Sequence, residues 1–472
     1  MLEKHEQIFE ENHMENRDLK KYQALLKPYT ELRIHENRST RYFFMNGNLV
    51  RNEKSTVSGV SARVYHNGFF GFASSPVIDD ENVEEVVKKA KENAAFLASK
   101  STTEKQPFTS EAAYEYRDFS TTRNRLTEED VLNYLKAIDQ YIATKYPELI
   151  SRDLKLLALD MEKDLLTSDG TYSHLLWPRT TLYIDLTAGN SDEPCQLTEI
   201  FGGRGHFEDL FFKPEDLNEK IDQLYVELMK KNSGVQPVAG YHEVIIDADL
   251  VGMLAHEALG HTVEADLVRN GSIAGEYMNK KVASELITLV DFAHTYNGEI
   301  LLVPVFIDDE GVVSKDAVII DQGMLRSYMH NRDSAESFGM ENTGNARAWE
   351  YSDEPLIRMR NTCILPGEST LEEMISSVEN GYYFTKTNNG QADSTGEFMF
   401  GVTAGYEIVN GKLGNAIKDT TISGRAFDVL SSVTMVSKDM KWECAGMCGK
   451  KQPIPVSVGG PAIKCKINVG GK

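Results

Sequence analysis

The chain has 472 residues, of which 41% are hydrophobic and 26% are charged, a composition that excludes a disordered chain, a fibrous repeat and a coiled coil. Its 72 acidic residues outnumber its 50 Lys and Arg residues, which gives a net charge of −22. A protein this acidic lacks the positive footprint that phosphate backbones require, so we predict no nucleic-acid partner.

The sequence also bears on compartment and membrane contact. No run of about 18 apolar residues occurs, so we expect no membrane-spanning helix and no membrane partner. The N-terminus is rich in glutamate and has no apolar signal core, which predicts a cytoplasmic protein; a chain whose leader had been removed would look the same. The five cysteines are too few for a disulfide framework, in keeping with a reducing compartment.

The first part of the chain is predicted to form strands followed by a helix. Turn signals at Asn46-Gly47 and Asn67-Gly68 separate the β-rich runs, which are residues 31–35, 40–45, 59–65 and 69–73. Apolar residues then recur at helical spacing between residues 83 and 97, with Asp79 or Asp80 available as the N-cap.

The middle of the chain is predicted to hold two more helices and two strands. Thr127 and Asp130 resemble a capping box before the first helix, residues 131–142, and the second helix covers residues 217–228. The strands are expected around residues 154–159 and 180–188.

A chain of this length should divide, because a single hydrophobic core stops growing near ~250–300 residues. The predicted domains are residues 1–105 (α/β), 106–236 (α/β) and 237–472 (mostly β). The last is rich in short β runs, among them residues 303–308, 312–320 and 402–408, and holds one helix near its start. The predicted fold class is therefore α+β, with N-terminal mixed α/β regions followed by a mostly β C-terminal domain.

That one helix carries a His-Glu-x-x-x-His motif, formed by His256, Glu257 and His261, which is one residue longer than the metalloprotease His-Glu-x-x-His. On a regular helix, residues four apart point ~40° from each other, whereas residues five apart point ~140° from each other. A π-type turn of about 4.4 residues would bring five residues back to ~50°. We therefore predict that the helix is distorted near Gly260, where a glycine eases local unwinding.

Two other interpretations of the motif stay open. Paired histidines on an amphipathic helix often serve only packing or solubility, and closed structural zinc sites use the same ligand types. Glu257 argues against a structural site, because a carboxylate next to the first histidine is well placed to take a proton from water at a metal.

A catalytic zinc needs a third protein ligand and an open position. Glu264 and Asp266 follow His261 closely, and Cys448 is remote in sequence but offers a thiolate whose pKa Lys450 would lower. Cys448 is otherwise a small buried hydrophobic residue, or pairs with Cys444 in a Cys-x-x-x-Cys arrangement.

Residues 256–261 with Glu264 and Asp266 resemble the signature of the TldD/PmbA family of zinc metalloproteases. Further blocks match that family in order over roughly residues 30–472, and they are residues 59–64, 309–311, 343–347, 358–362, 396–398, 406–412, 447–450 and 455–461. Because the motif is retained, the chain resembles the TldD-type branch. One departure concerns the shape of a loop: Lys451 stands where relatives often have a glycine.

The resemblance implies zinc as the cofactor, His256, His261 and Cys448 as its ligands, and Glu257 as the general base. It also implies a peptide substrate and a two-subunit assembly, either a homodimer or a heterodimer with a motif-lacking paralogue.

We therefore predict a peptidase that acts on small or unfolded peptides bound as an extended strand beside the metal. The alternative is a non-catalytic binding or regulatory subunit of a peptide-processing complex, which the retained motif opposes. An additional donor to the developing oxyanion is expected, and the candidates by residue type alone are His330, Asn345, Arg347 and Arg358.

Overall fold

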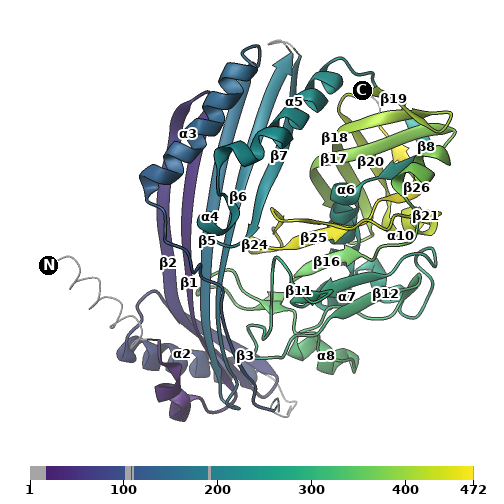
Figure 1. Cartoon of the computed structure of the whole chain (residues 1–472). Coiled ribbons are helices and arrows are strands. Elements are labelled where there is room, and N and C mark those ends of the chain that lie inside the picture. Colours follow the sequence, from purple (N-terminus) through teal and green to yellow (C-terminus); the bar gives the residue numbers. More distant parts are fainter. Residues whose placement is uncertain (1–16, 101–107, 109–110, 190–192, 471–472) are drawn as a thin grey trace.

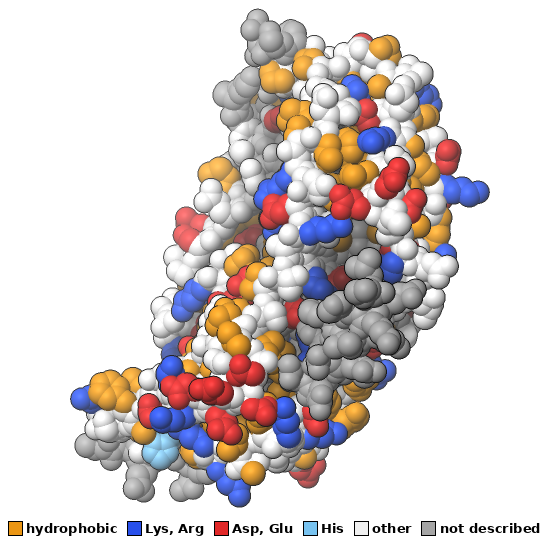
Figure 2. Space-filling view, turned by 90° about the vertical axis from the view of Figure 1, so that its left-hand side faces the viewer, with side chains coloured by type: hydrophobic (Ala, Val, Ile, Leu, Met, Phe, Trp, Pro, Cys, Tyr) orange, Lys and Arg blue, Asp and Glu red, His pale blue; other side chains and the backbone are white. Residues whose placement is uncertain are grey.

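The computed structural model describes residues 17–100, 108, 111–189 and 193–470. It confirms the predicted α+β class: a long curved N-terminal sheet stands beside a mostly β C-terminal domain (Figure 1). No helix in these ranges is both long and apolar enough to cross a membrane. On the face in Figure 2, acidic and basic side chains are interspersed with single hydrophobic ones.

The N-terminal sheet has the strand order β3-β2-β1-β5-β6-β4, with β7 added to β6. Its strands are β1 (Thr30–Met45), β2 (Asn48–His66), β3 (Phe69–Ser75), β4 (Tyr114–Asp118), β5 (Ser151–Thr167), β6 (Tyr172–Gly189) and β7 (Pro194–Arg204). The turns at Asn46-Gly47 and Asn67-Gly68 are confirmed, because all four residues have positive φ angles. The two runs predicted at residues 31–35 and 40–45 form the single strand β1.

Helices pack on one face of this sheet in two groups. At one end α2 (Asp80–Ala98) and η1 (Leu19–Leu25) cover Leu32 and Ile34 of β1. At the other end α3 (Glu128–Lys145) and α5 (Asn218–Asn232) cover Tyr42 and Phe44, beside α4 (Phe207–Leu210) and η2 (Pro214–Leu217). Two predicted caps are confirmed: Asp79 caps α2, and Thr127 forms a capping box with Asp130 at α3.

The first two predicted domains share this sheet. Strand β1 lies before residue 105 and pairs along almost its whole length with β5, from Glu31 opposite Thr167 to Met45 opposite Asp153. The boundary at residues 105 and 106 stays a prediction, but hydrogen bonds of one continuous sheet connect the two sides.

A closed barrel forms one half of the C-terminal domain. Its strands are β8 (Gly240–Ile246), β17 (Asn380–Ala392), β18 (Glu397–Val409), β20 (Thr420–Arg425) and β26 (Ile463–Val469). The ring closes because β18 pairs with β17 as well as with β20. Strands β19 (Lys412–Ala416) and β21 (Met435–Val436) attach to β18 and β26.

The other half is a sheet with the order β13-β12-β9-β16-β25-β22. These strands are β9 (Leu289–Phe292), β12 (Ala317–Asp321), β13 (Met324–Leu325), β16 (Asn361–Ile364), β22 (Lys441–Glu443) and β25 (Ser457–Gly460). Three short pairs accompany it: β10 (Thr295–Tyr296) with β11 (Glu299–Ile300), β14 (Ala346–Arg347) with β15 (Leu356–Ile357), and β23 (Met447–Cys448) with β24 (Ile454–Pro455).

A helical segment lies in the core between the barrel and this sheet. It consists of α6 (Ala248–Met253), η3 (Leu254–Gly260) and η4 (His261–Val263). Leu250 and Leu254 share one hydrophobic cluster with Phe400 of the barrel and Ile364 of the sheet. The remaining helices are α7 (Ala265–Arg269), η5 (Ile273–Glu276), α8 (Arg332–Phe338), α9 (Leu371–Ser376) and α10 (Ala426–Ser431).

Two of the three named β runs of this domain were predicted wrongly. Residues 303–308 form no strand, because the side chain of Asn361 bonds both the N–H and the carbonyl of Val303 in place of a neighbouring strand. Of residues 312–320, only the part within β12 is a strand. Residues 402–408 lie within β18, as predicted.

Ion pairs and hydrogen bonds join the N-terminal sheet to the C-terminal domain. Lys163 of β5 lies 2.7 Å from the Asp309 carboxylate, and Arg63 of β2 lies 2.5 Å from that of Glu310. Arg179 of β6 donates to the carbonyl of Gly446 at 3.2 Å. The sheet therefore contacts the chain segment that leads to Cys448.

Candidate metal centre

The helical segment of the motif is distorted where its spacing requires it. Leu254–Gly260 is a π-helix, and the N–H of His261 bonds to the carbonyl of His256. This confirms the predicted wide turn between the two histidines.

Gly260 has a different role from the predicted one. Its φ of −54° is an ordinary helical value, so no unusual backbone conformation requires a glycine. A Cβ at this position would lie 2.1 Å from Sδ of Met359, a buried residue just before β16. The glycine therefore permits close packing of the π-helix on the segment beside it.

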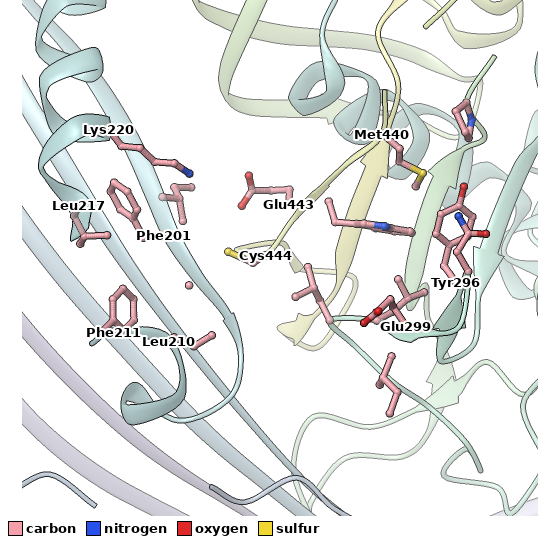
Figure 3. Close-up of a pocket in the computed structure, with 18 of the residues that line it drawn as sticks. Phe201, Leu210, Phe211, Leu217, Lys220, Tyr296, Glu299, Met440, Glu443 and Cys444 are labelled. Carbon is pink, nitrogen blue, oxygen red and sulfur yellow. The ribbon is translucent and has the colours of Figure 1, made fainter. Parts of the chain in front are cut away.

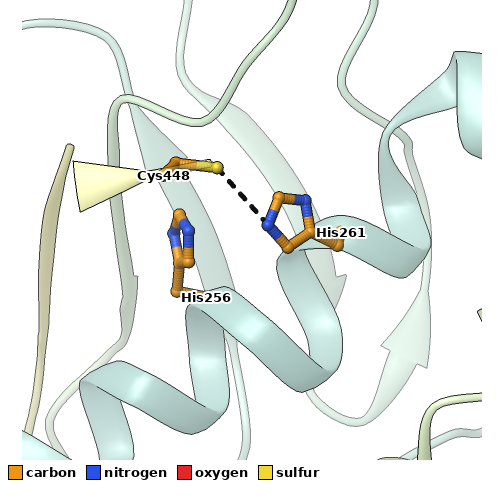
Figure 4. A group of neighbouring side chains, drawn as sticks. All are labelled: His256, His261 and Cys448. Carbon is orange, nitrogen blue, oxygen red and sulfur yellow. Dashed lines mark hydrogen bonds between the residues drawn. The ribbon is translucent and has the colours of Figure 1, made fainter. Parts of the chain in front are cut away.

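The structure brings His256, His261 and Cys448 together. One ligand atom from each lies within 4.8 Å of the other two, and the side chains converge in Figure 4. Sγ of Cys448 is 3.4 Å from Nε2 of His261, and the two imidazole centroids are 5.1 Å apart. Cys448 comes from the end of β23, far from the helix in sequence.

The donor set fits a zinc ion. Both ring nitrogens of His256 are buried and have no hydrogen-bond partner among the described residues, which is a costly state for an imidazole. A metal bound between the three side chains would satisfy one of these nitrogens. Two imidazoles and a thiolate are ligands that catalytic zinc sites use, with a fourth position left open.

Electrostatics favour the metal-binding form of the cysteine. Burial raises the pKa of Cys448, but the imidazoles of His256 and His261 outweigh it and lower the pKa to about 3. Burial lowers the pKa of His261, while Glu264 and Cys448 raise it to about 10. Without metal the site therefore holds a thiolate beside an imidazolium.

Glu257 lies beside both histidines. Its Oε1 is 4.0 Å from Nε2 of His256, and its Oε2 is 3.8 Å from Nε2 of His261. The side chain is 25% exposed, so solvent reaches it. A carboxylate in this place can exchange protons with a water molecule at the centre.

Glu264 and Asp266, the alternative ligands, have other partners. Glu264 is fully buried and its Oε2 accepts a hydrogen bond from Nδ1 of His261 at 2.7 Å, on the side of the ring away from Cys448. Lys450 lies 3.3 Å from the same carboxylate and 2.8 Å from that of Asp266. The sequence indicated Glu264 only as a possible ligand, although its place three residues after His261 is also a signal for this orienting role.

The four candidate oxyanion donors are engaged elsewhere. Arg347 donates to the carbonyls of Met359 and Pro455, and Arg358 to the carbonyls of Cys448, Lys450 and Gln452. Asn345 donates to Asp291, and Nδ1 of His330 contacts Ser334. Nε2 of His330 and Nε of Arg358 are buried without a hydrogen-bond partner among the described residues, and an oxyanion role for any of the four stays a prediction.

Cys444 lies apart from the metal-ligand cluster and borders a cavity of about 840 Å³ between the two halves of the molecule (Figure 3). One wall includes Phe201 and Phe211 of the N-terminal half, and the other includes Tyr296 and Trp442. Burial raises the pKa of Cys444 to about 12, the opposite of Cys448, and both are free thiols. No disulfide joins Cys444 to Cys448 in this structure.

A second group of metal-ligand types lies on the N-terminal sheet and consists of Glu162, Asp164 and His174. Arg17 lies 2.6 Å from Glu162 and 3.0 Å from Asp164, and Arg38 lies 2.7 Å from Glu162. Since guanidinium groups already neutralise these acids, the group is an ion-pair network.

Comparisons with known proteins relate the chain to proteins described as metallopeptidases or metalloproteases. Residues 239–471 match the family described as the PmbA/TldA metallopeptidase C-terminal domain, and residues 30–94 match its domain 1. A zinc metalloprotease TldD homolog of Saccharolobus solfataricus is 30% identical over 420 residues, which are 88% of this chain and 90% of that protein. A metalloprotease TldD homolog of Haemophilus influenzae is 32% identical over 359 residues, 73% of each chain.

A solved structure shares the fold. The crystal structure of TldE from Thermococcus kodakarensis superposes with a TM-score of 0.76, covering 97% of this chain and all of the other, at 17% identity. At this identity the likeness concerns the architecture alone.

Proposed function

The chain belongs to the PmbA/TldD metallopeptidase family, and from this premise we propose that it is a zinc-dependent peptidase acting on small or unfolded peptides. The observation that supports this most is the convergence of His256, His261 and Cys448, with the Glu257 carboxylate beside both imidazoles. The relatives named above are called metalloproteases, which supports the reaction class.

In this proposal His256, His261 and Cys448 hold the ion. Bound zinc supplies a Lewis acid that polarises the scissile carbonyl and lowers the pKa of a water molecule toward ~7. The Glu257 carboxylate takes the proton of the attacking water and later delivers it to the leaving amine. Glu264 holds the proton of His261 on Nδ1, which leaves the lone pair of Nε2 free for the metal.

We also propose that the substrate binds as an extended strand. β22 is the last strand of its sheet, and Trp442 and Glu443 of β22 border the 840 Å³ cavity. Cys448 follows only a few residues later. An extended peptide would pair with this edge, on the chain segment that leads to Cys448, whereas a folded protein would need local unfolding to do the same.

The experiment compares zinc-loaded wild type with Glu257→Gln on an unstructured polypeptide and on a stable folded domain of similar composition. We expect wild type to cleave the unstructured chain much faster, and the variant to retain zinc without cleaving. If Glu257→Gln cleaves as fast as wild type, Glu257 is not the general base. If wild type cleaves both substrates at equal rates, the extended-strand site is contradicted. Peptide binding without cleavage by the zinc-loaded wild type would favour the binding or regulatory subunit instead.

The cytoplasmic location and the pairing with a second copy or a motif-lacking paralogue stay predictions. Mass measurement of the protein co-purified from its own cells tests the assembly, since a homodimer and a heterodimer differ in subunit masses.

A further inference from the structure

The loop that follows Cys448 is bonded to one arginine. Arg358 is fully buried, and its Nη2 donates to the carbonyl of Cys448 at 2.7 Å. Its Nη1 donates to the carbonyls of Lys450 at 3.0 Å and Gln452 at 2.8 Å. A single guanidinium thus bonds three carbonyls within five residues of chain that begin at the proposed ligand.

This loop has little regular structure of its own. Strand β23 ends at Cys448, and β24 begins only at Ile454. Lys451 has a φ of 58°, in the left-handed region that favours glycine. Within the loop the carbonyl of Lys450 also accepts from the N–H of Gln452 at 2.6 Å. The planar fork of an arginine can bond several carbonyls at once.

Charge neutralisation does not explain Arg358. No carboxylate of the described residues forms a salt bridge with it, although buried guanidinium groups are usually paired with acids. Arg360, two residues along and equally buried, does have such a partner in Asp291 at 2.9 Å. The Nη1 and Nη2 groups of Arg358 instead donate to carbonyls of the Cys448 loop.

The backbone of Arg358 is itself held in place. Its N–H donates to the carbonyl of Asn345 at 2.9 Å, and the side-chain amide of Asn345 donates to the carbonyl of Arg358 at 3.0 Å. That amide also donates to Asp291, which accepts from the backbone N–H of Arg360. Hydrogen bonds within the C-terminal domain therefore fix the backbone from which the guanidinium of Arg358 reaches the loop.

We propose that Arg358 is a positioning residue that sets the place of the Cys448 thiolate and thereby the affinity for zinc. The inference rests on the proposed function, because it takes Cys448 as a ligand. The remaining ligands come from a packed helical segment, His256 from η3 and His261 from η4, whereas Cys448 comes from the start of an irregular loop that these bonds hold. Partners that orient metal ligands typically account for about 10- to 100-fold in metal affinity.

The test compares Arg358→Lys with Arg360→Lys, which changes the same residue type at the same burial. The Arg360 guanidinium shares Asp291 with the network around Arg358 but bonds no carbonyl of the loop, so it controls for the direct contacts with the loop. Zinc affinity is measured by chelator competition, and thermal stability and far-UV circular dichroism are measured alongside. We expect Arg358→Lys to weaken zinc binding about 10- to 100-fold, because lysine keeps the charge but lacks the fork. Arg360→Lys should keep the zinc affinity within about threefold of the wild-type value, even if it lowers Tm as much as Arg358→Lys does.

A second readout does not depend on metal. In metal-free protein, the alkylation rate of Cys448 at pH 7 should change in Arg358→Lys and stay at the wild-type value in Arg360→Lys. Arg358→Gln, which retains two N–H donors, provides a further variant if the lysine variant does not fold. Wild-type zinc affinity in folded Arg358 variants, or an equal loss in Arg360→Lys, would overturn the inference; failure of wild type itself to bind zinc would instead overturn the proposed function.

Discussion

The imidazole of His261 is bonded on one side to the buried carboxylate of Glu264, at 2.7 Å from Nδ1, so that its Nε2 is directed at Sγ of Cys448. We therefore predict that Glu264→Gln lowers zinc affinity about 10- to 100-fold, because the amide no longer fixes the ring as the carboxylate does. Chelator competition measures this. Asp266→Asn is the control, since Asp266 contacts Lys450 and not the ring, and an equal loss there would contradict the role of Glu264.

The second prediction concerns pH. Because the pKa of Cys448 is lowered to about 3, its thiolate persists in metal-free protein throughout the neutral range. Its alkylation by iodoacetamide should be nearly independent of pH between about 5 and 8, whereas an ordinary thiol with a pKa near 8.5 becomes about tenfold more reactive per pH unit. Mass spectrometry of the modified peptide identifies the site. A rate that rises steeply over this range would contradict the thiolate–imidazolium pair.

Zinc uptake should release a proton from His261, whereas at a simple thiol site the proton comes from the cysteine. His261, with a pKa raised to about 10, carries a proton that binding must displace, whereas Cys448 has already lost its own. Affinity should therefore rise with pH by the equivalent of about one proton, and calorimetry in buffers of different ionisation enthalpy should report about one proton released. In Cys448→Ser the thiolate–imidazolium pair is lost, so the number of protons released on zinc binding should change.

Gly260 is predicted to be intolerant of a side chain. In Gly260→Ala the new Cβ would meet Sδ of Met359 at 2.1 Å, so the free energy of unfolding should fall by about 1–3 kcal/mol. Gly449→Ala, beside the proposed ligand but with no atom within 4 Å of the new Cβ, should change stability by less than about 0.5 kcal/mol. Denaturant unfolding measures both. In a double-mutant cycle, Gly260→Ala and Met359→Ala together should cost less than the sum of their separate losses, and additive losses would locate the clash elsewhere.

Buried His330 should make the fold sensitive to acid. Burial and, to a smaller extent, the charge of Arg269 lower its pKa from 6.5 to about 4. The unfolded chain therefore takes up a proton first as the pH falls, so the stability present above 6.5 is lost between 6.5 and about 4. His330→Gln, which does not titrate, should lose about 1–3 kcal/mol less than wild type over this interval. Identical pH profiles from denaturant unfolding would contradict the prediction.

The sequence predicted the helix distortion for a physical reason. The five-residue spacing of His256 and His261 conflicts with a 3.6-residue turn, and the π-helix at Leu254–Gly260 resolves that conflict. Local signals also predicted both Asn-Gly turns and the caps at Asp79 and Thr127, because each depends on a few neighbouring residues.

Features that depend on distant residues could not be predicted in this way. Residues 303–308 have the composition of a strand, yet Asn361, remote in sequence, bonds the backbone of Val303. The place of Cys448 beside the helix was available only through the family resemblance, because no local pattern links residues so far apart. The contacts of Arg358 with the carbonyls of its loop leave no signal in the sequence at all.

The most direct test of the central claim is the zinc content of Cys448→Ser and Cys444→Ser, purified in parallel with wild type and measured by mass spectrometry. Both variants remove one thiol from the same stretch of chain, but only Cys448 lies with the two histidines. We expect Cys448→Ser to lose most of its zinc and Cys444→Ser to retain the wild-type content. Retention by Cys448→Ser together with loss in Cys444→Ser would contradict the assigned metal centre.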